Sequence, residues 1–517
     1  MITAEWETME APAARGAPGT RPGAASGAVA VIFATTPAAR LTSGKATLLD
    51  RLTAQLRTLS VREVQVVART EDTGGGLADD LRAVAKAARA SSGPIAVLYG
   101  DLVAHTEALA AVLDHPSRGS RALVAPGPAA PPLPPVRTRK GRIAAAGNSF
   151  HRVEAPDAAF HGVLQVGEAH LASLADVAEE LADLAQNRGL GRAGDTEVAD
   201  LLLAGLVRAG VPVRAAPLGG LHCARVTSQG AADEAVRRLS DVDERAARLR
   251  AAVKSDDGLF ATYCVSTWSP HLVRLAARLR MTPNAITGVS VGLAVVAAVW
   301  FTAGERGAQI AGAAALLLSF ALDCVDGQLA RYTRSFSPLG AWLDATFDRV
   351  KEYLVYAGLA IGYAGSVQAG ETGPGGIWAL AVAAMLLQAL RHMIDFSYAG
   401  GLADATRDGE RPPLPLSVAS DLPHLDDPGG GLRKGGAGAA TDGSVASRVA
   451  WLSRRLDLGV ATRWAKKVVV LPIGERMALI AVTAAVFNAR VTFLALIGWG
   501  ALALAYTLAG RVGRSLT

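Results

Sequence analysis

The sequence predicts an N-terminal α/β domain followed by an α-helical integral membrane bundle of six transmembrane helices. Apolar patterns of strand and helix length alternate over residues 28–226, and long apolar segments dominate residues 259–514. Half of the 517 residues are hydrophobic, 19% are charged, and the mean hydropathy is +0.27. Because a soluble protein of this size carries about a quarter charged residues, the composition indicates a large membrane portion.

The charge balance and the aromatic content argue against a nucleic-acid partner. The 52 Lys and Arg residues exceed the 46 Asp and Glu residues by six, and only 5% of residues are aromatic. Such a small, scattered excess suits anionic lipid or phosphorylated substrates and forms no basic stripe. The three cysteines form neither a disulfide framework nor a CxxC pair.

The first half of the chain contains a lead-in, a domain and a linker. Residues 1–27 are rich in Ala, Gly and Pro without an apolar run of signal-peptide length, which predicts a disordered lead-in. Residues 28–226 predict a parallel sheet covered by helices, with strands at 28–35, 61–69, 94–101 and 160–166 and helices at 46–59 and 77–90. Residues 227–258 predict one charged, solvated linker helix.

The second half contains six apolar segments, of which the fifth is the shortest. They are Ala285–Ala303, Ala308–Leu322, Leu343–Ala364, Ile377–Tyr398, Met477–Phe487 and Val491–Ala509. An amphipathic stretch at 263–280 predicts an interfacial helix before the first of them. A Gly-rich stretch at 400–444 separates the fourth from the fifth. The basic residues 454–467 that follow are expected to lie on anionic lipid or to bind an anionic acceptor.

Loop charges predict the orientation in the membrane. Basic residues follow the second segment, precede the fifth and follow the sixth: Arg331, Arg334, Arg454, Arg455, Arg463, Lys466, Lys467, Arg511 and Arg514. The opposite loops hold only Arg306 and Arg490. By the positive-inside rule, both termini, the N-terminal domain and the second loop face the cytoplasm of a multi-pass cell-membrane protein.

Four carboxylates crowd the second and third membrane segments. Asp323 and Asp326 are spaced i,i+3, and Asp344 and Asp348 are spaced i,i+4, so each pair lies on one helix face. The short connection between the helices lets the pairs converge, and four such charges need a cation. Oxygen ligands suit Mg²⁺ or Mn²⁺, and two such ions would bind a pyrophosphate. The alternative interpretation is caps or solvated charges at helix ends.

The spacing of these residues is specific. The run from Asp323 to Asp348 reads D-x2-D-G-x2-A-R-x8-G-x3-D-x3-D, with Gly340 opening the third segment. It resembles the signature of the CDP-alcohol phosphatidyltransferase family, and the resemblance extends over about residues 259–514. It implies a phospholipid-synthesising transferase in which an acceptor hydroxyl displaces CMP from a CDP-linked donor.

The resemblance also implies roles for individual residues. Asp323, Asp326, Asp344 and Asp348 would be ligands of two divalent ions, and Asp348 would also be the base that deprotonates the acceptor. The CDP part of the donor would contact Gly327, Ala330, Arg331, Ser337, Asn284 and Thr287. The acceptor would be an alcohol or an alcohol phosphate, and the enzyme would be a homodimer.

Ionisable side chains also interrupt the fourth apolar segment. Arg391, His392 and Asp395 lie within it, where charge is costly and usually functional. Arg391 is a candidate for contact with an acceptor phosphate. The alternative is an internal pair between Arg391 and Asp395, which are spaced i,i+4.

The N-terminal domain resembles, more weakly, the Rossmann-like sugar-phosphate nucleotidyltransferase fold. Its third strand ends at Asp101, the position of a metal ligand in that fold. The first loop departs from the pattern, because it holds a single glycine, Gly44, a proline, Pro37, and a lone Lys45 in place of a Gly-rich phosphate loop. We therefore expect a domain that kept the fold and lost or altered nucleotidyl transfer.

Three functions follow from these patterns. The first is transfer of a phosphatidyl group from CDP-diacylglycerol to an acceptor alcohol. The second is a bifunctional enzyme whose N-terminal domain makes a soluble CDP-alcohol such as CDP-inositol for the membrane domain. The third is a non-catalytic membrane scaffold, against which the complete set of four intramembrane aspartates argues.

Overall fold

A computed structural model describes residues 27–69, 75–115, 117–127, 129, 133–253, 258–366, 376–408, 414–419, 464 and 468–515. The chain forms two compact units, Met1–Ala247 with Gly409–Gly430 and Arg248–Asp408 with Gly431–Thr517. Outside the described residues lie positions 1–26 of the expected lead-in at 1–27, most of the Gly-rich stretch and all of the basic residues at 454–467.

The N-terminal unit contains an eight-stranded sheet in the order β4-β1-β5-β10-β7-β11-β9-β8. The strands are β1 (Ala28–Ala34), β4 (Val61–Ala68), β5 (Ile95–Tyr99), β7 (Arg121–Pro126), β8 (Pro135–Arg139), β9 (Arg142–Ala146), β10 (Ala158–Val166) and β11 (Arg214–Pro217). The four expected strands are present, but the expectation of a parallel sheet is wrong. β10 runs antiparallel to β5 and β7, and β8 and β9 form a hairpin. The turn of that hairpin places Lys140 and Gly141 at φ 50° and 74°, as a type I′ turn requires.

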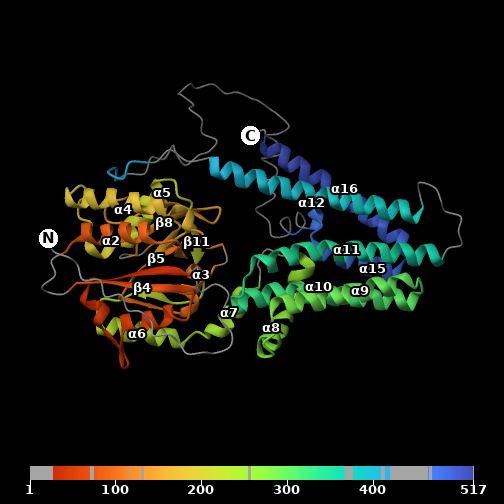
Figure 1. The fold of residues 1–517 in the computed structure, drawn as a ribbon, viewed down its shortest axis with the longest axis horizontal. Helices are drawn as coiled ribbons and strands as arrows, with labels where there is room; N and C mark the ends of the chain where they lie inside the picture. Colours follow the sequence, from red (N-terminus) through yellow and green to blue (C-terminus); the bar gives the residue numbers. More distant parts are fainter. Residues whose placement is uncertain are drawn as a thin grey trace, which may run out of the picture. The chain divides into compact units, whose positions relative to one another are not determined.

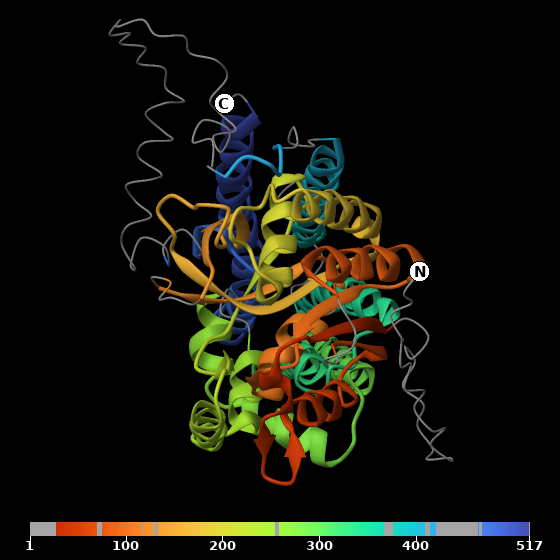
Figure 2. The ribbon, with the colours of Figure 1, turned by 90° about the vertical axis from the view of Figure 1, so that its left-hand side faces the viewer.

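Helices cover both faces of this sheet (Figures 1 and 2). On one face Val29, Val31 and Phe33 pack under α2 (Leu77–Ala90), α4 (Leu171–Gln186) and α5 (Val198–Arg208). The alternate residues Ala30 and Ile32 pack on the other face under α1 (Leu48–Leu56) and α3 (Thr106–Leu113). Successive side chains of a strand point to opposite faces, so a strand that is apolar throughout is covered on both. Two short strand pairs complete the unit: β2 (Thr42–Ser43) with β3 (Ala46–Thr47), and β6 (Leu102–Ala104) with β12 (Cys223–Arg225).

Two helices replace the single linker helix expected at 227–258. They are α6 (Gln229–Ser240) and α7 (Glu244–Ala252). α6 is not a solvated spacer, because its Ala232, Ala235 and Leu239 are buried in a cluster with Leu48 and Val103 of the N-terminal unit. One apolar residue per turn is enough to dock a helix that is otherwise charged.

Residues 414–419, which we call the docking segment, pack on the N-terminal unit although they follow the fourth membrane segment in the chain. Leu416 is 2% exposed and belongs to the core under α4 and α5. The Arg208 guanidinium donates to the Pro415 carbonyl at 3.2 Å. Burial lowers the pKa of His151 to about 4, so the neutral ring bonds to the Leu416 carbonyl oxygen through Nε2 at 3.0 Å. The docking segment is therefore a structural part of this unit.

Replacing Leu416 should release the docking segment. Truncation of a buried leucine costs about 2 kcal/mol or more, which corresponds to about 30-fold faster proteolysis when cleavage follows local opening. We expect limited proteolysis of full-length Leu416→Ala near residues 409–430 to accelerate by this factor. Val418→Ala is the matched control, because Val418 is 39% exposed. Equal cleavage rates in the two variants would contradict the docking.

Apart from Ala303 and Phe487, the six expected apolar segments lie within helices of the membrane unit. These helices are α9 (Pro283–Thr302), α10 (Arg306–Thr333), α11 (Pro338–Ser366), α12 (Ile377–Asp408), α15 (Ile473–Val486) and α16 (Ala489–Ser515), preceded by α8 (Ser269–Arg278). Among the described residues, four helices are long and apolar enough to cross a membrane: α9, α10, α12 over Ile377–Tyr398 and α16 over Ala489–Arg511. α11 carries several charges in its first half, and α15 has 14 residues where a span needs about 20.

Small residues bring the first three of these helices into backbone contact. A side chain at Gly358 or Gly362 of α11 would lie 2.3 or 2.0 Å from carbonyl oxygens of Ala298 and Phe301 on α9. Ser290 of α9 and Ser319 of α10 each donate to the other's carbonyl oxygen, at 2.9 and 2.7 Å. Close approach through glycine and serine is the usual packing between helices in lipid, and it fixes α10 and α11 around α9.

Candidate metal centre

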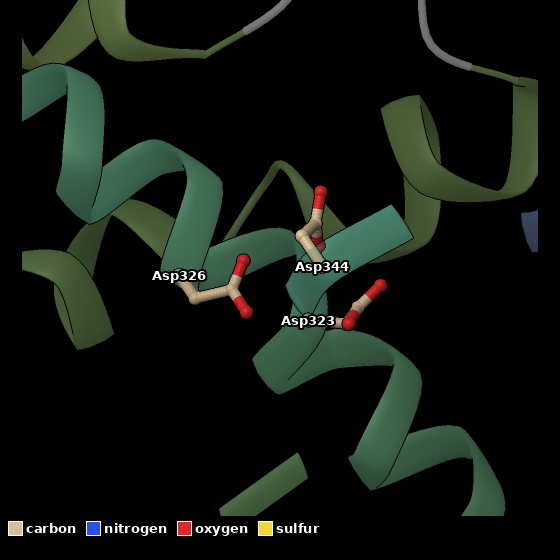
Figure 3. A group of neighbouring side chains, drawn as sticks. All are labelled: Asp323, Asp326 and Asp344. Atoms are coloured by element: carbon tan, nitrogen blue, oxygen red, sulfur yellow. The ribbon is translucent and has the colours of Figure 1, made fainter. Parts of the chain in front are cut away.

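Three of the four motif aspartates form one cluster (Figure 3). α10 carries Asp323 and Asp326 one turn apart, and α11 carries Asp344. Each offers a carboxylate oxygen, and these oxygens all lie within 4.8 Å of one another. We call these residues the aspartate triad.

The helix termini position the triad. α10 is followed by Arg334, whose backbone is in the left-handed conformation with a φ of 56°. This conformation turns the chain sharply. Four residues later α11 begins, and the Gly340 amide donates to the Ser337 hydroxyl at 2.9 Å, which caps the helix. α10 and α11 therefore present their carboxylates to each other across a short connection.

The surroundings of the triad fit a divalent cation. Asp326 is buried, and its Oδ2 accepts a hydrogen bond from the Thr287 hydroxyl of α9 at 2.5 Å. Asp323 is half-buried and Asp344 is exposed, so the cluster opens on one side. Three convergent carboxylate oxygens are ligands that Mg²⁺ and Mn²⁺ prefer, with open positions left for water or phosphate.

The fourth aspartate has a different partner. Asp348 lies outside the triad, and its Oδ1 is 3.1 Å from Nζ of Lys351. Lys351 also donates a hydrogen bond to Asp323. Among the described residues no hydrogen bond of good geometry reaches Asp348 Oδ1, although this atom is buried. Lys351 was not among the residues expected at the site, although its i,i+3 spacing from Asp348 in an apolar helix was a usable signal.

The residues expected on the nucleotide side fall into two places. Near the start of α11, Asn284 Oδ1 and Ser337 Oγ lie close to Gly340. Each would be only 2.9 Å from a Cβ at that position, so the glycine leaves room for both. On α10, the Arg331 guanidinium lies against Gly327, and its Nε donates to the Ala252 carbonyl. Ala330, also on α10, is half-buried. Thr287, also expected on the nucleotide side, bonds to Asp326 of the triad.

Residues 280–406 match the CDP-alcohol phosphatidyltransferase family. The resemblance expected from the aspartate spacing is confirmed over this segment, which contains the triad, Asp348 and Lys351.

Two relatives of known name align with part of the chain. The archaetidylinositol phosphate synthases of Aeropyrum pernix and Pyrococcus horikoshii are each 34% identical to it, over 94 and 86 residues. These alignments cover 18% and 17% of this chain and 46% and 44% of the relatives, so the chain spans less than half the length of the relatives it matches. Among solved structures, the inositol-1-phosphate CTP transferase of T. maritima aligns with 43% of this chain and 98% of its own, at 13% identity and a TM-score of 0.31.

Deeper in the CDP-alcohol phosphatidyltransferase segment, Arg391 is buried and internally bonded. It donates to the Val470 carbonyl oxygen at 2.6 Å and to Gln388 Oε1 at 3.1 Å. The expected alternative, an internal Arg391–Asp395 pair, is wrong because Asp395 pairs with Arg511 of α16.

A second buried charge network borders this segment and was not expected from the sequence. Glu352 of α11 is fully buried and accepts two hydrogen bonds from Arg476 of α15, at 3.0 and 3.1 Å. The Tyr356 hydroxyl donates to the same carboxylate at 2.6 Å. The network joins α11 to α15, helices that the sequence separates by more than a hundred residues.

Outside the CDP-alcohol phosphatidyltransferase segment, Asp101 of the N-terminal unit already has a cationic partner. Arg225 Nε and Nη2 donate to its two carboxylate oxygens, each at 2.9 Å, and Asp101 is 3% exposed. The same guanidinium lies 3.6 Å from the centre of the Tyr99 ring. The first loop forms a short helix at Pro37–Arg40 and the β2–β3 hairpin, whose Lys45 is exposed. A carboxylate held by a bidentate arginine has few lone pairs left for a metal.

We therefore expect the full-length protein to release no pyrophosphate from CTP. The assay supplies CTP, Mg²⁺ and a panel of alcohol phosphates that includes inositol phosphate and glycerol phosphate. Asp101→Ala is expected to give the same background rate as the wild type. Pyrophosphate release that disappears in Asp101→Ala would contradict this expectation and favour the bifunctional enzyme.

Proposed function

We propose that this protein is an integral membrane CDP-alcohol phosphotransferase of phospholipid biosynthesis. It transfers the phosphatidyl or phospho-alcohol group of a CDP-linked donor to an acceptor hydroxyl and releases CMP. The observation that carries the proposal is the aspartate triad between α10 and α11, within the segment that matches the family.

The reaction forms one phosphorus–oxygen bond and breaks another. The acceptor oxygen attacks the β-phosphorus of the donor, and the bond from that phosphorus to the oxygen of CMP breaks. Divalent ions, Mg²⁺ or Mn²⁺, neutralise the charge that develops on the pyrophosphate when they are bound. Asp323, Asp326 and Asp344 would hold such ions. Asp348, which lies outside the triad and pairs with Lys351, would be the base that takes the acceptor's proton.

The remaining residues would orient the donor and the acceptor. Asn284 and Ser337 at Gly340, together with Gly327, Ala330, Arg331 and Thr287, would contact the CDP part. Arg391 would contact an acceptor phosphate after giving up its bond to Gln388. The names of the two relatives suggest an inositol phosphate as the acceptor.

The protein would cross the cell membrane six times as a homodimer. α11 would be the third span, with Lys351 paired to Asp323 of α10 and Glu352 paired to Arg476 of α15, and α15 would be a short fifth span. The N-terminal unit and the triad would face the cytoplasm, where CDP-linked donors are made. A cysteine at Ser335 should then react with an impermeant label from the cytoplasmic side only, and labelling from the outside would overturn this orientation.

The activity is tested directly on membranes that contain the full-length protein. They are incubated with Mg²⁺, labelled CDP-diacylglycerol and candidate acceptors, including inositol phosphate and glycerol phosphate. Release of CMP with a new phospholipid in the mass spectrum supports the proposal. No CMP from any pairing of a lipid or soluble CDP donor with these acceptors would overturn it. Activity with a soluble CDP-alcohol alone would favour the bifunctional alternative.

A further inference from the structure

Lys351 brings a positive charge into the candidate metal centre from the chain itself. The side chain is buried, with 5% of its surface exposed. Its Nζ pairs with Asp323, lies 3.1 Å from Asp348 Oδ1 and lies 3.3 Å from the Ser290 hydroxyl. These three partners come from α9, α10 and α11, so the ammonium lies where the three helices meet.

We propose that Lys351 is a resident cation that takes the place of one of two divalent ions, so that the free enzyme binds a single divalent ion at the aspartate triad. Lys351 is then a positioning residue that holds Asp323 and Asp348 for the reaction. The proposal rests on the proposed function only in taking the triad as a metal centre.

Burying the charge of Lys351 is costly. A long cationic side chain is almost never buried unless it is paired, because removing its charge from water costs far more than its apolar stem gains. Its neighbours Asp323 and Asp348 supply the compensating charges. The buried ammonium therefore depends on both carboxylates for its stability.

Competition for the same oxygens completes the argument. A Mg²⁺ ion that bridged Asp323 and Asp348 would have to lie about 2.0–2.1 Å from a carboxylate oxygen of each. The ammonium of Lys351 already lies against both of these carboxylates. Two cations repel each other, and a charged ammonium has no lone pair with which to ligate a metal. The triad also includes Asp326, which the Thr287 hydroxyl holds in place, and the exposed Asp344, so an ion there would have two carboxylate ligands besides Asp323.

The experiment counts ions in full-length protein in detergent, with no donor or acceptor present. Mn²⁺ bound at saturation is measured by equilibrium dialysis and by electron paramagnetic resonance, in which two neighbouring Mn²⁺ ions couple and a single ion does not. We expect one ion per wild-type chain with the spectrum of an isolated ion. In Lys351→Met, which keeps the volume and removes the charge, we expect two ions per chain and a coupled spectrum.

Two further variants serve as controls. Lys351→Arg keeps the cation and should bind one ion. Arg349→Met removes a charge from the same helix, where Arg349 contacts the Ala345 carbonyl and the Phe396 ring, and it should also bind one ion.

Each outcome decides the proposal. Two coupled ions in the wild type would overturn it, even if Lys351→Met fails to fold. An unchanged count in folded Lys351→Met would overturn it as well. If the wild type binds no Mn²⁺, the triad is not a metal centre. If the wild type binds one Mn²⁺ but releases no CMP, only the proposed reaction is overturned.

Discussion

Asp326→Asn is expected to abolish CMP release and to remove the divalent ion from the centre. Asp326 is the buried member of the triad, and the substitution removes its charge while preserving its shape. Changes in groups that merely orient metal ligands cost roughly 10–100-fold in metal affinity or activity, so the loss of a ligand should cost more than about 100-fold. The measurements are CMP release from labelled donor and Mn²⁺ binding in the same preparation.

Thr287→Val provides the graded control for this prediction. It removes the hydroxyl that donates to Asp326 at 2.5 Å and leaves the ligand in place. We expect its loss of activity to be smaller, within roughly 10–100-fold. An Asp326→Asn protein that keeps wild-type Mn²⁺ binding would show that the triad is not a metal centre.

Asp348→Asn should behave differently from Asp326→Asn. Asp348 lies outside the triad, so the ion and the donor should still bind. Turnover should be lost, because the asparagine cannot accept the acceptor's proton. Wild-type turnover in Asp348→Asn would exclude this residue as the base.

Arg476→Met is expected to cause the largest loss of stability. It leaves the carboxylate of Glu352 buried without its arginine, and the Tyr356 hydroxyl is its remaining hydrogen-bond partner among the described residues. Breaking a buried pair by removing one partner costs about 3–5 kcal/mol. The measurement is the thermal denaturation midpoint of the full-length protein in detergent, which should fall clearly below that of the wild type.

The double variant Glu352→Gln with Arg476→Met shows whether Arg476→Met loses stability because Glu352 is left unpaired or because packing around Arg476 is lost. Removing both charges leaves no unpaired ion, so much of the stability should return. A double variant as unstable as Arg476→Met would mean that the cost comes from packing. A wild-type midpoint in Arg476→Met would contradict the structural importance of the pair.

The spacing of the motif predicts which aspartates lie close together in the candidate metal centre. Because Asp323 and Asp326 lie one turn apart on the same helix, local geometry alone places them on one face. The connection between α10 and α11 is short, so it keeps Asp344 near the end of α10 that carries Asp323 and Asp326. The strand positions follow in the same way, since runs such as Ala28–Ala34 are apolar on both faces and must be covered on both.

The partners of buried charges were decided only by the tertiary structure. Helical spacing suggested that Arg391 would pair with Asp395, but Asp395 pairs with Arg511, more than a hundred residues away. Asp101 and Arg225, which pair in the N-terminal unit, are also more than a hundred residues apart. No local pattern encodes such pairs, because each depends on which helices or strands the whole fold brings together.

The sequence by itself therefore determined where the main apolar strands and helices lie and which aspartates share a helix face, because periodicity and short connections act within a few residues. The tertiary structure decided that β10 runs antiparallel, that residues 414–419 pack on the N-terminal unit, and that Lys351 enters the centre. Each of these depends on the free energy of burying groups that are distant in the chain. That free energy is defined only once the rest of the core has formed around them.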